Sequence, residues 1–345
     1  MNPTAWEAVI RPVVSFVPVL AFLAALRLMD SYKLVPRRRI LAAIGAGAAA
    51  ALFCYAVNSM VFALLGSHAS AYARFGAPIV EELAKGCYWM FLIATARVAF
   101  MVDAGLCGFA VGAGFALVEN FFYLHALAGG GIGVFILRGF GTAVMHGGVA
   151  AIAAMLSVFL SERFGWRGVR LFVPGLLAAI LIHSLFNQGL VSPVLSAVLM
   201  LLVLPGLLAG VFFWGEASLR HWLGDKLDKD IELLHMIATG ELHKTRSGMY
   251  LQSLQDAFPP EIRGDMLCML QLTIELSVRA KGDLLLREAG MEVPPDPEIE
   301  ARFQELAYLQ KSLGRTGLLA VAPLLAQSPR DLWEMHRLAQ QRPPT

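Results

Sequence analysis

Long apolar runs fill the first two thirds of the chain and stop near Trp214. Seven of these runs are long enough to cross a bilayer, for which a helix needs about 20 residues. Their approximate limits are 12–29, 40–66, 79–99, 104–127, 135–160, 169–190 and 194–214. The pattern predicts an all-α fold, with a polytopic membrane bundle of about seven spanning helices.

The rest of the chain has a different pattern. Apolar residues such as Leu227, Ile231 and Leu234 recur at the spacing of one helical face. Charge separates the same two parts, because residues 1–215 hold 13 Lys/Arg and 7 Asp/Glu, whereas residues 216–345 hold 15 and 19. We therefore expect a membrane-embedded helix bundle over 1–215, and a soluble, cytoplasmic helical domain of unknown role over 216–345.

Composition narrows the class of protein. Hydrophobic residues make up 57% of the chain and charged residues 16%, below the ~25% that is usual in soluble domains. Neither part has the concentrated basic stretch of a nucleic-acid binder. The four cysteines form no CxxC motif, so neither a disulfide framework nor a cysteine-ligated metal is expected. These features indicate an integral membrane protein.

Basic residues predict the orientation. Eight Lys/Arg near the ends of the apolar runs fall on one side of the predicted bundle, and three fall on the other. Because Lys and Arg are enriched in cytoplasmic loops, the N-terminus is expected outside and residues 216–345 inside. The first run has no basic start, so we interpret it as a retained helix rather than a cleaved signal peptide.

Ionisable side chains interrupt four of the apolar runs, where they are energetically costly and need partners. They are Glu81, Glu82 and Lys85 in the third run, Glu119 in the fourth, His146 in the fifth and His183 in the sixth. With a rise of ~1.5 Å per residue and alternating helix directions, most of them lie within roughly 15 Å of the outer boundary. This shared depth predicts one polar site in the outer leaflet.

Local spacings suggest chemistry at this site. Lys85 can pair with Glu81 or Glu82, at four or three residues' distance on one helix, which leaves the other carboxylate for acid–base work. His183 and Asn187 share a helical face, so they could ligate a metal or donate hydrogen bonds to an oxyanion. Each feature alone has an ordinary alternative: a solvated helix end, a histidine that bonds a neighbouring helix, or a capping asparagine. The agreement in depth favours a joint site.

The motifs resemble those of the PrsW family of intramembrane proteases, distant relatives of the CAAX prenyl proteases and bacteriocin-processing enzymes. The matching motifs are Glu81-Glu82-x-x-Lys85, Phe115-Ala116-x-x-Glu119-Asn120, Arg138 with His146, and His183-x-x-x-Asn187. The distant relatives have Glu-Glu-x-x-x-Arg, and histidine in place of Glu119; the glutamate is typical of the PrsW branch. The resemblance covers roughly residues 75–190 and gives no role to the C-terminal 130 residues.

The resemblance implies hydrolysis of a peptide bond within or beside the membrane. PrsW-like proteins are associated with cleaving a membrane-anchored anti-sigma factor on its extracytoplasmic side. We therefore expect a multi-pass protein of the bacterial cytoplasmic membrane whose partners are the lipid bilayer and a single-pass membrane protein substrate. The acidic domain 216–345 would be available to a cytosolic protein partner.

Two versions of the mechanism stay open at this point. In both, Glu81 or Glu82 takes a proton from water, and Lys85 orients the other glutamate. In one version Glu119, His146 and His183 form an open three-ligand Zn²⁺ site. In the other the same residues act without metal, as in a glutamate protease, and His183 with Asn187 holds the oxyanion. The chain lacks the H-E-x-x-H helix of common zinc proteases.

Two other functions compete with proteolysis. A transporter or channel also uses buried carboxylates and histidines, but it predicts inverted repeats and polar groups near the midplane, which the sequence does not show. A non-catalytic membrane scaffold, with domain 216–345 recruiting a cytosolic partner, predicts that neutral substitutions in the polar cluster leave function intact.

Overall fold

A computed structural model describes residues 5–66, 69–127, 129–190, 192–294, 296–325 and 328–339 of the chain. Every regular element in these ranges is helical, as the sequence predicts. The chain separates into two compact units, Met1–Glu216 and Ala217–Thr345. The boundary between them falls inside one long helix.

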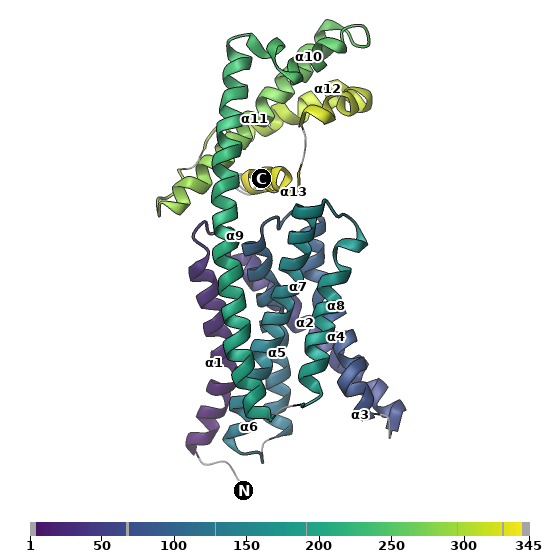
Figure 1. Cartoon of the computed structure of the whole chain (residues 1–345), viewed down its shortest axis with the longest axis vertical. Coiled ribbons are helices and arrows are strands. Elements are labelled where there is room, and N and C mark those ends of the chain that lie inside the picture. The colour runs from purple at the N-terminus through teal and green to yellow at the C-terminus, as the bar shows by residue number, and fades with distance from the viewer. Residues whose placement is uncertain are drawn as a thin grey trace. The chain divides into compact units, whose positions relative to one another are not determined.

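The first unit is a bundle in which α1, α2, α5 and α7 lie side by side (Figure 1). Its elements are α1 (Ala5–Met29), α2 (Arg37–Leu65), α3 (Ala69–Ala71), η2 (Tyr72–Gly76), α4 (Ala77–Ala94), α5 (Met101–Ala126), α6 (Ile132–Leu137), η3 (Arg138–Thr142), α7 (Ala143–Phe164), η4 (Val169–Leu171), α8 (Val173–Asn187) and the first part of α9 (Pro193–Ala238). Each of the seven predicted runs lies on one or more of these helices.

Six helical stretches in the described residues are long and apolar enough to cross a membrane. They are Val9–Met29, Arg37–Leu65, Met101–Ala126, Ile132–Phe164, Val169–Asn187 and Ala197–Ala238. Helix α4 is not among them, because its 18 residues include Glu81, Glu82 and Lys85. The structure therefore supports a multi-pass membrane protein and six of the seven predicted spans.

Helix α5 forms the centre of the bundle. Every residue from Met101 to Ala116 is buried, and a helix that is apolar all round is one that other helices surround. Close approach to its neighbours depends on glycine. A Cβ atom at Gly112 would overlap the carbonyl oxygen of His146 in α7, and one at Gly114 would overlap that of Ile44 in α2.

Two π-helical segments precede helices that carry predicted site residues. Segment η2 leads directly into α4, and η3 leads directly into α7. A π-helical turn contains an extra residue and therefore rotates the side chains that follow it, and such turns are frequent at functional sites. Tyr72 begins η2 and Arg138 begins η3, so both segments supply side chains close to the polar network.

Helix α9 continues well past the end of the seventh predicted run. We expected that run to stop at residue 214, but the helix continues to Ala238. The reason is local, because residues 216–238 contain no proline and five of the 23 are leucine, a good helix former.

Every regular element in the described residues of the second unit is helical. After α9 the unit contains η5 (Glu241–Lys244), α10 (Arg246–Ser253), α11 (Pro260–Glu288), α12 (Ile299–Leu325) and α13 (Pro329–Ala339). Helix α12 is kinked at Gly314, where φ is +60°. The apolar core of the second unit includes Met266, Met269, Leu276, Val321 and Leu338. Beside this core, the buried Lys281 makes ion pairs with Asp230 and Glu334, each at 2.9 Å.

Candidate active site

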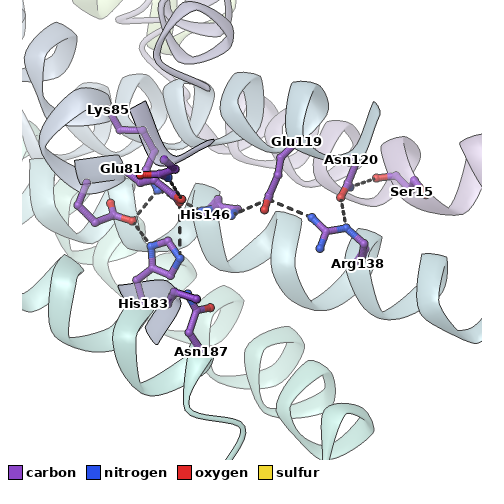
Figure 2. A network of polar contacts seen from close by, with 12 residues as sticks. Ser15, Glu81, Lys85, Glu119, Asn120, Arg138, His146, His183 and Asn187 are labelled. Carbon is purple, nitrogen blue, oxygen red and sulfur yellow. Dashed lines mark hydrogen bonds and ion pairs between the residues drawn. The ribbon is translucent and has the colours of Figure 1, made fainter. Parts of the chain in front are cut away.

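Four helices of the first unit bring the predicted polar residues into one connected network (Figure 2). Helix α4 supplies two glutamates and a lysine, α5 supplies a glutamate and an asparagine, and α7 and α8 supply one histidine each. The sequence predicted this convergence from depth alone, and the contacts below show how it is made.

A buried ion pair lies at the back of the network. Lys85 Nζ lies 2.5 Å from Glu82 Oε1, and His183 Nδ1 lies 2.7 Å from the same oxygen. Glu82 is 1% exposed and Lys85 is fully buried. Their spacing of three residues on α4 places both side chains on one helical face. Glu82 therefore neutralises Lys85 and fixes the ring orientation of His183.

His146 lies between two charged groups. Its Nδ1 is 3.1 Å from Lys85 Nζ, and its Nε2 is 2.9 Å from Glu119 Oε2. An ammonium group can only donate, so Nδ1 accepts from Lys85 and the Nε2–H donates to Glu119. The Phe115 ring packs against both residues, with its centroid 4.7 Å from Lys85 Nζ and 5.1 Å from the imidazole centroid.

Glu119 is the start of a polar chain that leads to α1. Arg138 makes an ion pair with Glu119 Oε2 at 3.1 Å and donates from Nε to Asn120 Oδ1 at 3.0 Å. Asn120 in turn donates to the carbonyl oxygen of Ser15 at 2.8 Å. The Arg138 guanidinium lies 3.5 Å from the centroid of the Tyr123 ring. Glu119 is thereby held on the arginine side of His146.

Glu81 is placed differently from Glu82. Its Oε2 lies 3.8 Å from His183 Nε2, and its Oε1 accepts a hydrogen bond from Asn58 Nδ2 at 3.2 Å. The Tyr72 hydroxyl donates to Asn58 Oδ1 at 2.7 Å. Sequence reasoning missed Asn58 and Tyr72. An asparagine inside the apolar run 40–66 was the available signal for the first, whereas nothing in the sequence marked the second.

A cavity of about 1030 Å³ opens beside the network. Polar and charged residues on its wall include Asn58, Glu81, Glu119, Arg138, His146, His183 and Asn187, and aromatic residues include Tyr55, Phe62, Phe122, Tyr123 and Phe186. Asn187 lines the cavity, but its amide donates to the carbonyl oxygen of Ala73 at 3.2 Å. Glu82 and Lys85 are not on the wall. A volume of this size is at the upper end of ligand pockets.

The residues present fit a divalent metal. In the described residues, one set of three has ligand atoms that all lie within 4.8 Å of one another: Glu81, His146 and His183. Its carboxylate is Glu81, where the sequence analysis expected Glu119. Two imidazoles and one carboxylate are the donors of many open zinc sites, in which ligand atoms at ~2.0–2.1 Å from the ion lie roughly 3.3 Å apart. The 3.8 Å between Glu81 Oε2 and His183 Nε2 is close to that separation.

His183 and His146 differ in which ring nitrogens already have a hydrogen-bond partner, and therefore in which are free to bind a metal. The Glu82 carboxylate on His183 Nδ1 leaves Nε2 as the ligand atom, which is the usual arrangement around a metal-bound histidine. Both nitrogens of His146 already contact a neighbour. Coordination by His146 therefore replaces its contact with Lys85 or with Glu119.

Comparison with known proteins identifies a family. A family model described as 'PrsW family intramembrane metalloprotease' matches residues 35–213. This range is more than half of the chain, and it contains all the residues that line the cavity. No curated protein and no solved structure was found to match. On the strength of the family match, the chain belongs to the PrsW family of intramembrane metalloproteases.

Proposed function

We propose that the chain is an endopeptidase that hydrolyses a peptide bond of a membrane-anchored protein. The observation that carries the proposal is the meeting of Glu81, His146 and His183 within 4.8 Å, at the wall of a cavity of about 1030 Å³. Family membership supports the class of reaction, and the geometry supports the roles of the residues.

Glu81 is the carboxylate that we assign to water activation. A general base must lie within hydrogen-bond reach of the water that it deprotonates, and Glu81 lines the cavity. Glu82 is buried behind it, with one oxygen shared between Lys85 and His183. In the proposed step the water oxygen attacks the carbonyl carbon, and its proton moves to Glu81. The proton then passes to the amide nitrogen as the C–N bond breaks.

The remaining polar residues orient the two histidines or lie beside the place of the reaction. Glu82 holds the His183 ring, and Lys85 neutralises Glu82 and contacts His146. Glu119 holds His146 from the other side. Asn187 lies on the cavity wall, where it serves the oxyanion only if its amide leaves the carbonyl oxygen of Ala73.

Glu81, His146 and His183 are the residues that would hold a divalent metal such as Zn²⁺. When bound, such an ion polarises a carbonyl group and lowers the pKa of water. The same three side chains also serve a metal-free mechanism, in which a doubly protonated His183 keeps its Nδ1–H on Glu82 and donates from Nε2 to the oxyanion. Metal content separates the two versions.

Topology forms part of the proposal. We place α4 as a seventh span, because its ionisable Glu82 and Lys85 face the protein interior while Ile79, Leu83 and Phe91 are 44–46% exposed and suited to lipid. Because Lys and Arg are enriched in cytoplasmic loops, we propose that the N-terminus lies outside and the second unit in the cytoplasm. We further propose a bacterial cytoplasmic membrane, which family membership supports. Cleavage would then occur near the extracytoplasmic face of a single-pass protein.

The test has two stages. Newly formed N-termini in the membrane proteome are first compared between cells with the wild-type chain and cells with Glu81→Gln, to find single-pass proteins that only the wild type cuts. Such a protein is then reconstituted in liposomes with purified enzyme. We expect cutting by wild type and by Glu162→Gln, whose glutamate is exposed at the end of α7, and none by Glu81→Gln. Equal cutting by Glu81→Gln would overturn the assignment.

A further inference from the structure

Two residues outside the proposed catalytic set form a hydrogen-bonded chain that ends on Glu81. The Tyr72 hydroxyl donates to Asn58 Oδ1 at 2.7 Å, and Asn58 Nδ2 donates to Glu81 Oε1 at 3.2 Å. An ionised carboxylate only accepts hydrogen bonds, so the amide nitrogen must face Glu81 and the amide oxygen must face the hydroxyl. The chain is therefore directed toward one oxygen of Glu81.

Asn58 lies at a buried position, where an amide needs hydrogen-bond partners. It is 9% exposed, on the same helix as the buried Ala51 and Cys54. An unpaired amide in such surroundings is costly, but here both its oxygen and its nitrogen are used. A buried asparagine that joins helices can donate to a backbone carbonyl, as Asn120 does to the carbonyl oxygen of Ser15. Asn58 instead bonds a side chain on the cavity wall.

The Tyr72 ring is fixed by its packing. The ring of Phe62 meets it edge-on, with centroids 5.2 Å apart and an interplanar angle of 85°. Gly76, the last residue of the same π-helical segment, leaves the space that the ring fills, because a Cβ atom there would overlap it. The hydroxyl of Tyr72 therefore reaches Asn58 from a defined position.

We propose that Asn58 and Tyr72 are positioning residues, which hold Glu81 by Oε1 so that Oε2 stays directed toward His183 Nε2, 3.8 Å away. This inference rests on the proposed function, in which Glu81 is the base and a metal ligand. The terminal torsion of a glutamate is broad, so a released carboxylate can turn into the cavity. A misplacement of ~1 Å in an active site costs about 100-fold in rate, and loss of a partner to a metal ligand costs about 10–100-fold in metal affinity.

The test uses the full-length enzyme and three substitutions. Tyr72→Phe removes only the hydroxyl, Asn58→Leu removes both hydrogen bonds at similar volume, and the double variant combines them. For each we would measure kcat, KM and the affinity for Zn²⁺ by competition with a chromophoric chelator. Tyr88→Phe, the same chemical change on α4 at a half-buried position away from the cavity wall, is the matched control.

We expect Tyr72→Phe and Asn58→Leu each to lower kcat by about 10–100-fold and to weaken Zn²⁺ binding similarly, with KM changed less than about twofold. The double variant should be no worse than Asn58→Leu alone, because Tyr72 acts through Asn58. Tyr88→Phe should match wild type. If Asn58→Leu does not fold, Tyr72→Phe still decides, since it removes a single oxygen atom.

Two results would overturn the inference: wild-type kcat and Zn²⁺ affinity in Tyr72→Phe, or strictly multiplicative losses in the double variant. Glu81→Gln, measured in parallel, separates this failure from that of the proposed function. An inactive Glu81→Gln with a fully active Tyr72→Phe refutes only the positioning role. An active Glu81→Gln refutes the role of Glu81 itself.

Discussion

The imidazole Nδ1 of His183 lies 2.7 Å from Oε1 of Glu82, although 101 residues separate them in the chain. The same carboxylate oxygen lies 2.5 Å from the Lys85 ammonium group. One buried oxygen thus orients a histidine on the cavity wall and neutralises a cation behind it. The glutamate pair on α4 is in this way divided: Glu81 is partly buried and lines the cavity, whereas Glu82 is buried behind it.

Replacing Glu82 tests this division. Glu82→Gln leaves the buried charge of Lys85 without its counter-ion, and breaking a buried ion pair from one side costs about 3–5 kcal/mol. We expect a large fall in the melting temperature in detergent and a loss of activity of about 100-fold or more, because His183 also loses its orienting carboxylate.

Adding Lys85→Met to Glu82→Gln removes the unpaired charge. We expect this double variant to recover most of the stability while staying poorly active, because His183 still lacks its carboxylate partner. Recovery of full activity together with stability would show that Glu82 serves only the fold.

Metal content distinguishes Glu81 from Glu119 as the carboxylate ligand. If Glu81, His146 and His183 hold the ion, then Glu81→Gln and His183→Ala purify with little metal and regain little on dialysis against Zn²⁺. Glu119→Gln should keep most of its metal, because Glu119 bonds His146 and Arg138. Elemental analysis of the purified variants gives the answer, and the reverse pattern would favour Glu119. Chelation should abolish wild-type activity, and added Zn²⁺ should restore it.

Arg138 should depend on its shape as well as its charge. Its guanidinium contacts Glu119 and Asn120 together and lies on the Tyr123 ring, which a lysine cannot reproduce. We expect Arg138→Lys to retain the fold and to lose about tenfold in kcat/KM, and Arg138→Leu to lose more, because Glu119 is then left without its cation. Arg74→Lys, on the same cavity wall but exposed, provides the comparison. If Arg138→Lys and wild type have equal rates, only the positive charge of Arg138 matters and its guanidinium geometry does not.

The position of His146 depends on close packing of α7 against Gly112 of α5. A Cβ atom at Gly112 would overlap the carbonyl oxygen of His146, whereas one at Gly45 meets nothing within 4 Å. We expect Gly112→Ala to cost about 1–3 kcal/mol of stability, as overpacking usually does, and to lower activity by displacing His146. Gly45→Ala should be neutral or slightly stabilising. Thermal melts of both variants in the same detergent make the comparison, which fails if the two shifts are equal.

Part of this arrangement could be predicted from the sequence. The cost of ionisable groups in apolar helices singled out Glu82, Lys85, His146 and His183, and the alternating helix directions gave them one depth. The rotation of a helix about its own axis could not be predicted in the same way. Helix α5 is buried on every side from Met101 to Ala116, so its sequence does not indicate which side faces the site.

The remaining differences arise from contacts that no periodicity encodes. The candidate ligand set includes Glu81, whose carboxylate accepts a hydrogen bond from Asn58 on another helix. The π-helical segment that precedes α4 also has no clear sequence signal. Helix α9 runs past residue 214 to Ala238 because no proline follows the apolar run before that residue. Hydropathy marks where the apolar run ends, but it does not mark where the helix ends.

The second unit carries a pH-sensitive contact. Burial raises the pKa of Glu334 from 4.5 to about 7, assisted by the nearby Asp331, while Lys281 and Ser277 oppose the shift. Between these two pH values the native chain holds one more proton than the unfolded chain. The free energy of unfolding of this unit should therefore fall as pH rises from 4.5 to about 7, by roughly 3 kcal/mol, and then level off.

Hydrogen exchange of the full-length protein in α11 and α13, which carry Lys281 and Glu334, measures that dependence. Glu334→Gln cannot ionise, so we expect its protection in this pH range to be nearly constant. Glu305→Gln, at an exposed position of α12, should retain the wild-type slope. If Glu334→Gln and wild type lose protection equally between pH 4.5 and 7, another group is responsible, and Glu334 is ionised throughout this range.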